Sequence, residues 1–483
     1  EINPEVVVYT ATNDGYVHAI DGVTGQELWS FIPKEHLPNL VKLFFDPESQ
    51  FKHYGVDGDI VPVVADRDQN GQIEAGDGDF VHIIFGMRRG GDSYYALDVT
   101  NKNSPEVLWR ISSPEMGQSW STPTVAKVAI DDPNLNADKA VVIIGGGYDN
   151  VHDTIAHPAT PDTDGAGIYM LDLKSGDVLW RAGTDIAADL RLAALTRSIA
   201  TQVRVIDING DGFADRMYAS DMGGQILRFD IANGQPAGSL VTGGVIAQLG
   251  AEGNAVGDVD TRRFYNAPDV SVFNDNIQNR RFLSISIGSG YRAHPLDNTN
   301  ADRFYSIRDA NVFNRLTQAE YNAFDVVKDA DLVEVSGQVG TTISAADKGW
   351  KFTLPANQKV LATSVTFNNE IFFTAFSPDN AAAATCSAGR GQNFLYRMSV
   401  TNGDPIADLD SIVAGSEDQH RVSDLAQGGI APSPRFLFPA ADDPDCEGAE
   451  CAPPPIGCIG VECFDPGFVN NPVRTLWTQD GID

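Results

Sequence analysis

A degenerate repeat runs through most of the chain and constrains the fold more than any other feature. Each copy has a short β-rich run, a glycine-containing turn, a second β-rich run that often ends in aspartate, and frequently a Leu-Trp pair. The clearest copy spans residues 8–31, and further copies lie near residues 82–109, 141–180, 217–230, 283–307, 364–398 and 429–477. Units of a few short strands cannot each bury an apolar face alone, so the copies must share a core.

This repeat predicts an all-β fold, a β-propeller of about seven irregular blades. A β-solenoid would repeat at shorter intervals, and a β-sandwich would not repeat the turn and the Leu-Trp pair in register. We expect residues 1–483 to form a single propeller domain, the C-terminal part of a longer exported protein. Long loop insertions are expected near 149–165, 236–280, 309–350 and 440–472, with a helix at 314–323.

Another apolar strand precedes several copies, at residues 59–65, 121–126 and 201–206. Two of these runs contain proline, which cannot donate to a neighbouring strand and is therefore confined to sheet edges. We expect these strands to lie nearest the central channel of the propeller.

The charge balance excludes some partners. The chain has 34 basic and 66 acidic residues, a formal net charge of −32 at pH 7. Such a surface repels phosphate backbones and anionic lipid headgroups, so we expect no nucleic-acid partner. Acidity also supplies oxygen ligands for hard cations, although by itself it indicates only solubility. No apolar run approaches the length of about 18 residues that a membrane span requires, so no direct membrane span is expected.

Four of the five cysteines lie in the Cys- and Pro-rich stretch 440–472, which we expect to be an insertion in the last blade. They form two Cys-x4-Cys units, Cys446 with Cys451 and Cys458 with Cys463. Two small disulfide loops are the natural interpretation and indicate an oxidising compartment. A zinc site is the alternative, although structural zinc usually takes narrower spacings. Cys386 is left over.

Residues 207–215 have the spacing of a calcium loop. Alternate side chains of a tightly coiled segment point inward, and a glycine at the sixth position allows the turn. The predicted ligands are Asp207, Asn209, Asp211, the Phe213 carbonyl and Asp215. Tyr218 stands at the twelfth position and offers no carboxylate, so this is a β-flanked loop and not an EF-hand. A hairpin turn without an ion is the alternative.

Residues 66–74 repeat this spacing after an equivalent apolar strand. Here the predicted ligands are Asp66, Asp68, Asn70, the Gln72 carbonyl and Glu74. Arg67 lowers the net negative charge nearby. We expect two calcium loops at equivalent positions in different blades.

Catalytic motifs are missing from the sequence. It has no His-Glu-x-x-His, no Gly-x-Ser-x-Gly and no P-loop, and its eight histidines form no ligand-like pair in a regular element. We therefore expect no enzymatic activity.

Two families resemble this chain. The Asp-Gly-x-Val-x-Ala-x-Asp-x-x-Thr-Gly-x-x-x-Trp unit at 14–29 is similar to the repeat of quinoprotein dehydrogenases, propellers that hold pyrroloquinoline quinone with calcium. This resemblance implies the alternative function, a quinoprotein-like oxidoreductase. The chain is short for that family, however, and it has no adjacent cysteine pair.

The chain more closely resembles the C-terminal domain of the PilY/PilC-type tip adhesins of type IV pili. The resemblance rests on Gly-x-Arg-Arg-Gly-Gly with Tyr-Tyr-Ala-Leu-Asp at 86–98, Trp-Ser-Thr-Pro-Thr at 120–124, the loop at 207–215 followed by 224–230, and Arg-Thr-Leu-Trp at 474–477. It implies a calcium-binding pilus-tip adhesin and biogenesis factor. Calcium occupancy would then regulate pilus extension against retraction, twitching motility and surface attachment.

The same resemblance implies partners and a location. The partners would be type IV pilus subunits and minor pilins, together with a host or abiotic surface receptor. The protein would be exported through the periplasm and outer membrane and would lie outside the cell, at the pilus tip.

Overall fold

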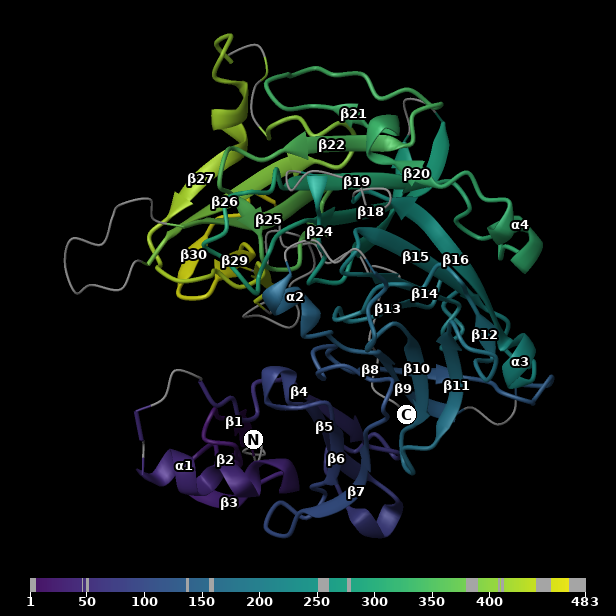
Figure 1. The fold of residues 1–483 in the computed structure, drawn as a ribbon, viewed down its shortest axis with the longest axis vertical. Helices are drawn as coiled ribbons and strands as arrows, with labels where there is room; N and C mark the ends of the chain where they lie inside the picture. Colours follow the sequence, from purple (N-terminus) through teal and green to yellow (C-terminus); the bar gives the residue numbers. More distant parts are fainter. Residues whose placement is uncertain are drawn as a thin grey trace.

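The computed structural model describes residues 6–45, 47–48, 52–135, 139–155, 160–250, 260–275, 279–378, 390–406, 409, 412–439 and 453–468. Within this part of the chain, seven β-sheets follow one another in sequence order, and we number them sheets 1 to 7. Figure 1 shows consecutive sheets succeeding one another around a central region, toward which β4, β8, β13 and β24 are turned. This arrangement confirms the predicted all-β propeller.

Sheets 1 to 3 contain the first twelve strands. Sheet 1 has β1 (Val7–Ala11), β2 (Val17–Asp21) and β3 (Glu27–Phe31). Sheet 2 has β4 (Ile60–Ala65), β5 (Phe80–Gly86), β6 (Tyr94–Asp98) and β7 (Glu106–Ile111). Sheet 3 has β8 (Thr124–Val128), β9 (Lys139–Gly145), β10 (Ile168–Asp172), β11 (Val178–Gly183) and β12 (Leu190–Arg191).

Sheets 4 and 5 have five strands each. Sheet 4 has β13 (Arg204–Ile206), β14 (Arg216–Ser220), β15 (Gln225–Ile231), β16 (Val241–Gln248) and β20 (Val327–Lys328). Sheet 5 has β17 (Asp269–Asp275), β18 (Arg280–Gly288), β19 (Arg303–Asp309), β22 (Gly349–Thr353) and β21 (Val333–Glu334). The outermost strands β12, β20 and β21 pair in parallel, whereas the strands inside each sheet pair antiparallel.

Sheets 6 and 7 complete the described strands. Sheet 6 has β23 (Lys359–Val360), β24 (Val365–Phe367), β25 (Glu370–Ser377), β26 (Gln392–Ser399) and β27 (Val422–Leu425). Sheet 7 has β28 (Arg435–Leu437), β29 (Ile456–Ile459) and β30 (Glu462–Phe464). The stretch 440–472, expected as an insertion, thus supplies two strands of this sheet.

Helical segments are short and lie in the connections. The α-helices are α1 (Leu40–Phe45), α2 (Val151–Thr154), α3 (Ala237–Leu240) and α4 (Gln318–Asn322). The 3-10 turns are η1 (Lys34–Asn39), η2 (Ala75–Asp77), η3 (Arg88–Gly90), η5 (Asp329–Asp331) and η7 (Glu417–Arg421). In the described part of the chain, no helix is long and apolar enough to cross a membrane.

The hydrophobic core is divided into clusters between neighbouring sheets. One cluster joins sheets 1 and 2, and the next four join sheets 2 and 3, 3 and 4, 4 and 5, and 5 and 6. A smaller cluster joins sheets 6 and 7. Sheets 2 to 6 therefore each bury apolar side chains against two neighbouring sheets, which is why no single repeat can fold alone.

The tryptophans of the first two Leu-Trp pairs join neighbouring sheets, whereas the buried Nε1–H of Trp180 in the third pair has no hydrogen-bond partner in the described part of the chain. The Nε1–H of Trp29 in sheet 1 donates to the Lys102 carbonyl of sheet 2 at 2.9 Å. Trp109 in sheet 2 makes the same bond to the Leu173 carbonyl of sheet 3 at 2.8 Å. Each of these two tryptophans thus buries a large apolar surface while its one donor joins the next sheet.

The strands expected to face the channel are confirmed as edge strands. β4, β8 and β13 each stand at one end of their sheet, and all three have residues that line the central cavity. Pro62 lies inside β4, where the missing N–H faces no strand on the open side.

Two details differ from the sequence-based expectation. Residues 236–280 are not irregular, because β16 and β17 lie within them. The strand β16 was not recognised in the sequence because it contains glycines, which are uncommon in strands. Gly243 is needed there because it lies opposite Phe229 of β15, and a Cβ at this position would meet the Phe229 ring at 2.4 Å. The helix expected at 314–323 is shorter, because Thr317 and Glu320 form a capping box that starts α4.

One of the two predicted disulfides is confirmed. Cys458 and Cys463 are bonded and stand directly opposite each other on β29 and β30. Cys446, Cys451 and Cys386 lie outside the described residues, as does the expected last-blade segment 473–477.

Candidate metal centres

Two acidic loops occupy equivalent places in sheets 2 and 4. The sheet 2 loop (residues 66–79) joins β4 to β5, and the sheet 4 loop (residues 207–215) joins β13 to β14. Each therefore connects the innermost strand of its sheet to the second strand, as the two sequence patterns predict.

The sheet 4 loop is coiled around the Asp207 carboxylate. Its oxygens accept the N–H groups of Gly210 at 2.7 Å and Gly212 at 2.8 Å. Both glycines have positive φ, 77° and 87°, a backbone conformation that residues with a Cβ rarely adopt. The Asn209 side chain accepts the Asp211 N–H at 2.8 Å, so the turn is closed by its own side chains.

The sheet 2 loop repeats this hydrogen-bond scheme. Asp66 accepts the Gly71 N–H at 2.8 Å, as Asp207 accepts that of Gly212. Asp68 accepts the Asn70 N–H at 3.2 Å, and Asn70 accepts that of Gln72 at 2.7 Å. The amide and the carboxylate at the third and fifth positions are exchanged between the loops, yet the backbone path is the same. Equivalent sequence spacing therefore produces equivalent geometry.

The loops differ at the carboxylate that closes them. In the sheet 4 loop, Asp215 accepts the Ile208 N–H at 2.8 Å and directly precedes β14. In the sheet 2 loop, Asp79 takes this place, accepting the Arg67 N–H at 2.9 Å and directly preceding β5. Glu74, which the sequence spacing selects, has an exposed side chain, and its N–H donates to Asp79 at 3.0 Å.

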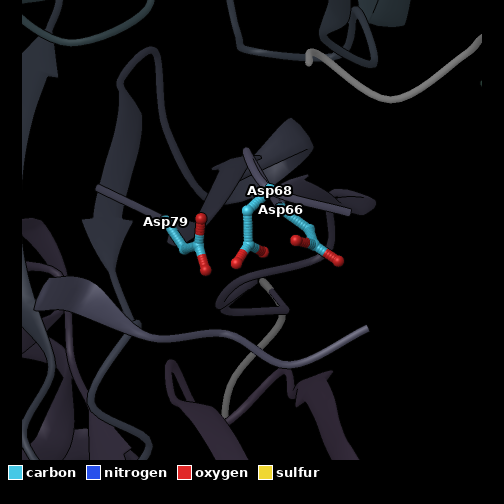
Figure 2. Close-up of side chains that lie close together, drawn as sticks. All are labelled: Asp66, Asp68 and Asp79. Atoms are coloured by element: carbon cyan, nitrogen blue, oxygen red, sulfur yellow. The ribbon is translucent and has the colours of Figure 1, made fainter. Parts of the chain in front are cut away.

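Asp79 was missed because it stands five positions beyond the ninth position of the loop, after the inserted turn η2. Figure 2 shows its carboxylate beside those of Asp66 and Asp68. Oxygens of these three side chains lie within 4.8 Å of one another, the one such acidic group in the described part of the chain. Counting backward from the next strand would have found it, because both loops end in aspartate immediately before a β-run.

Electrostatics at the loops favour a bound cation. Burial raises the pKa of the Asp215 carboxyl, and the charges of Asp211 and Asp207 raise it further, whereas hydrogen bonds from Ile208 and Asn209 oppose the rise. In the sheet 2 loop, one carboxylate oxygen of Asp66 is buried without a hydrogen-bond partner. A positive ion would stabilise both groups.

The donor set fits a hard cation. The side chains at the first, third, fifth and closing positions offer carboxylate and amide oxygens, the ligands that calcium prefers. Phe213 and Gln72 stand at the seventh positions, and their N–H groups bond to the fifth residues, Asp211 and Asn70. In the sheet 2 loop, calcium would draw ligands from carboxylates that already lie close together, whereas in the sheet 4 loop the carboxylates of Asp207, Asp211 and Asp215 would have to move closer.

Comparison with known proteins places these loops in a family context. Residues 3–243 match the family described as the PilY1 beta-propeller domain, a range that contains both loops. The type IV pilus biogenesis factor PilY1 of Pseudomonas aeruginosa strain PAO1 is 31% identical over 234 residues, which cover 47% of this chain and 17% of that protein. A type IV pilus biogenesis factor PilY1 homolog of Xylella fastidiosa strain Temecula1 is 24% identical over 420 residues, 82% of this chain and 26% of the relative.

A solved structure extends the likeness beyond the family match. The crystal structure of the Pseudomonas aeruginosa PilY1 C-terminal domain superposes with a TM-score of 0.62 at 19% identity and covers 97% of this chain and 93% of that chain. At this identity the likeness concerns the fold alone. The chain spans only 17% and 26% of the length of the two curated relatives.

Proposed function

From the premise that this chain belongs to the PilY1 β-propeller domain family, we propose that it is a calcium-binding, type IV pilus-associated propeller without a catalytic role. Its relatives are named as type IV pilus biogenesis factors, and the chain corresponds to a part of them. The observation that carries the calcium assignment is the shared hydrogen-bond scheme of the sheet 2 and sheet 4 loops.

The proposed action of calcium is local. The ion binds the carboxylates of one loop and cancels their mutual repulsion, so the connection between the innermost and second strands becomes rigid. Without the ion, Asp207, Asp211 and Asp215 repel one another, and the charges of Asp211 and Asp207 add to the burial that raises the pKa of Asp215. At a calcium concentration a hundredfold above Kd, one occupied site adds about 2.7 kcal/mol to the stability of the folded chain.

The biological role follows from the family and stays part of the proposal. An ordered or loosened loop at the propeller surface would regulate pilus extension against retraction, and with it twitching motility and surface attachment. The partners would be pilus subunits and minor pilins outside the cell, at the pilus tip, together with a surface receptor.

Replacing Asp207 by alanine tests the calcium assignment. Asp207 is the carboxylate around which the sheet 4 loop is coiled, so we expect the calcium stoichiometry to fall from two ions per chain to one. Titration calorimetry and metal analysis of dialysed protein measure this directly. Circular dichroism should report an unchanged fold.

The matched control is Asp14→Ala, which removes an exposed carboxylate from the turn between β1 and β2. It should leave both calcium ions in place. Unchanged stoichiometry in the Asp207 variant would refute the assignment. The quinoprotein alternative stays a prediction, and turnover with added quinone, calcium and a dye acceptor is its test.

A further inference from the structure

The middle of the ring contains a large cavity. Its volume is about 1320 Å³, and it is lined by the inner strands of six of the seven sheets: β4, β8, β13, β17, β24 and β28. Segments that precede these strands, the β5–β6 connection with Arg88, the β18–β19 connection with Arg292, and residues Cys458 and Gly460 complete the lining. Figure 1 shows β4, β8, β13 and β24 turned toward the central region. None of the residues that line the cavity belongs to the sheet 2 loop or the sheet 4 loop.

The charge of this cavity is opposite to that of the chain. Its charged lining residues are Asp59, Arg88, Arg204, Asp269, Arg292 and Arg435. Four guanidinium groups therefore face two carboxylates, although the whole chain carries a net charge of −32. A concave surface of one sign between low-dielectric walls concentrates ions of the other sign.

One of the two carboxylates is already neutralised. Asp59 accepts a hydrogen bond from Arg88 Nη2 at 2.9 Å and another from the Thr122 hydroxyl at 2.7 Å. Asp59 and Arg88 therefore compensate each other, and the excess positive charge belongs to the other arginines.

Arg292 is a lining arginine that has no carboxylate partner among the described residues. Its Nη1 donates to the Leu361 carbonyl at 2.5 Å. Burial lowers the pKa of Arg292, and the charge of Arg88 lowers it further, whereas Asp57 and Asp59 oppose the shift. A partly desolvated guanidinium without a carboxylate is costly, and an anion from outside the chain would relieve that cost.

Further donors and apolar groups complete the site. The side-chain amide nitrogen of Asn266 is buried in the cavity wall without a hydrogen-bond partner. Trp120, Pro62 and Leu361 supply apolar surface in the same lining. The volume greatly exceeds that of a single inorganic oxyanion, so the walls suit an anion with a carbon body.

We propose that the central cavity binds a small organic carboxylate, whose oxygens accept paired hydrogen bonds from the Arg292 guanidinium. A planar guanidinium presents two parallel N–H donors that match the two oxygens of a carboxylate. The Asn266 amide is the neighbouring donor for a second polar group of the same ligand. This site is separate from the calcium loops, so its test is independent of the proposed function.

The test uses glutarate, a flexible dicarboxylate, in titration calorimetry with the whole chain in calcium-containing buffer. We expect binding to the unmodified protein and at least tenfold weaker binding to Arg292→Gln. The neutral analogue glutaramide should not bind, because it offers no anionic oxygen to the guanidinium. Inorganic phosphate should bind more weakly than glutarate, because it leaves the apolar walls uncovered.

A matched control is Arg281→Gln. Arg281 is an exposed arginine whose Nε donates to Asn274 at 2.6 Å, and it lies outside the cavity lining. Its loss should leave glutarate affinity unchanged. If the glutamine variant of Arg292 does not fold, Arg292→Lys keeps the charge and removes the paired donors, and a weakening of about threefold or more is expected.

The proposal is overturned by any of four results. The first is that the unmodified protein does not bind glutarate at a glutarate concentration of about 10 mM. The second is that a folded Arg292 variant binds glutarate with the same affinity as the unmodified protein. The third and fourth are that glutaramide, or inorganic phosphate, binds as tightly as glutarate.

Discussion

Replacing Asp230 by asparagine should lower the free energy of unfolding by about 3–5 kcal/mol. The Asp230 side chain, in β15, is fully buried and accepts hydrogen bonds from Arg216 Nε at 2.6 Å and Arg228 Nη2 at 2.9 Å. It also accepts the Leu316 N–H at 2.9 Å, which ties the connection before α4 to sheet 4. Removing its charge leaves the buried Arg216 without a carboxylate partner among the described residues and leaves Arg228 with Asp309 alone, whose carboxylate accepts from Arg228 at 2.7 Å. Water cannot compensate them inside the core, so the cost is large.

Urea denaturation followed by circular dichroism, at fixed calcium concentration, measures this loss as a shift of the midpoint at constant slope. The control is Asp325→Asn, because Asp325 pairs with Lys348 at 3.0 Å while 87% of its side chain is exposed. An exposed pair of this kind contributes about 0–1 kcal/mol. If the Asp230 variant loses no more stability than the Asp325 variant, the argument that burial makes the difference is refuted.

Two further predictions concern the sheet 2 loop and the pH dependence of stability. Asp79→Asn should weaken calcium binding at the sheet 2 loop at least tenfold, whereas Glu74→Gln should leave it unchanged. The reason is that Asp79, and not Glu74, lies beside the other loop carboxylates. Titration calorimetry that ranks the two variants in the opposite order would refute this. The hydrogen bonds from Arg303 and Lys351 lower the pKa of Asp329 to about 2 against the desolvation that raises it, so the folded state favours its charged form. Asp329→Asn should therefore lower the free energy of unfolding by about 1–2 kcal/mol at pH 7. This difference in stability between the variant and the unmodified protein should disappear as pH falls from about 4 toward 2. A stability difference that is constant with pH would contradict the assignment.

Much of the architecture could be predicted from the repeat. The β-runs of the first three copies correspond to strands of sheets 1 to 3, and the Leu-Trp pair of each copy lies in the outer part of its sheet. These signals are local, because the alternation of apolar residues and the Asx turn each depend on residues that are close together in the chain. The aspartate that ends β2 shows this, because Asp21 accepts the N–H groups of Val23 and Thr24 within its own turn.

The candidate calcium loops were only partly predictable. Spacing placed Asp66, Asp68 and the sheet 4 loop residues correctly within coiled turns, because a nine-residue pattern encodes its own backbone path. The closing carboxylate of the sheet 2 loop was not predictable by counting, since the distance from Asp66 to Asp79 depends on an inserted turn. What places Asp79 there is the start of β5, and that strand is positioned by pairing with β4.

The sequence by itself determined the kind of unit that repeats, the order of the units and the two acidic loops, because each depends on residues close together in the chain. The tertiary structure alone decided which distant residues meet. Arg88, Arg292 and Asn266 lie in connections beside the strands of sheets 2 and 5, and they line one cavity only because the arrangement of the sheets brings these connections together. No spacing in the sequence encodes that convergence, since it is the sum of the packing angles between successive sheets.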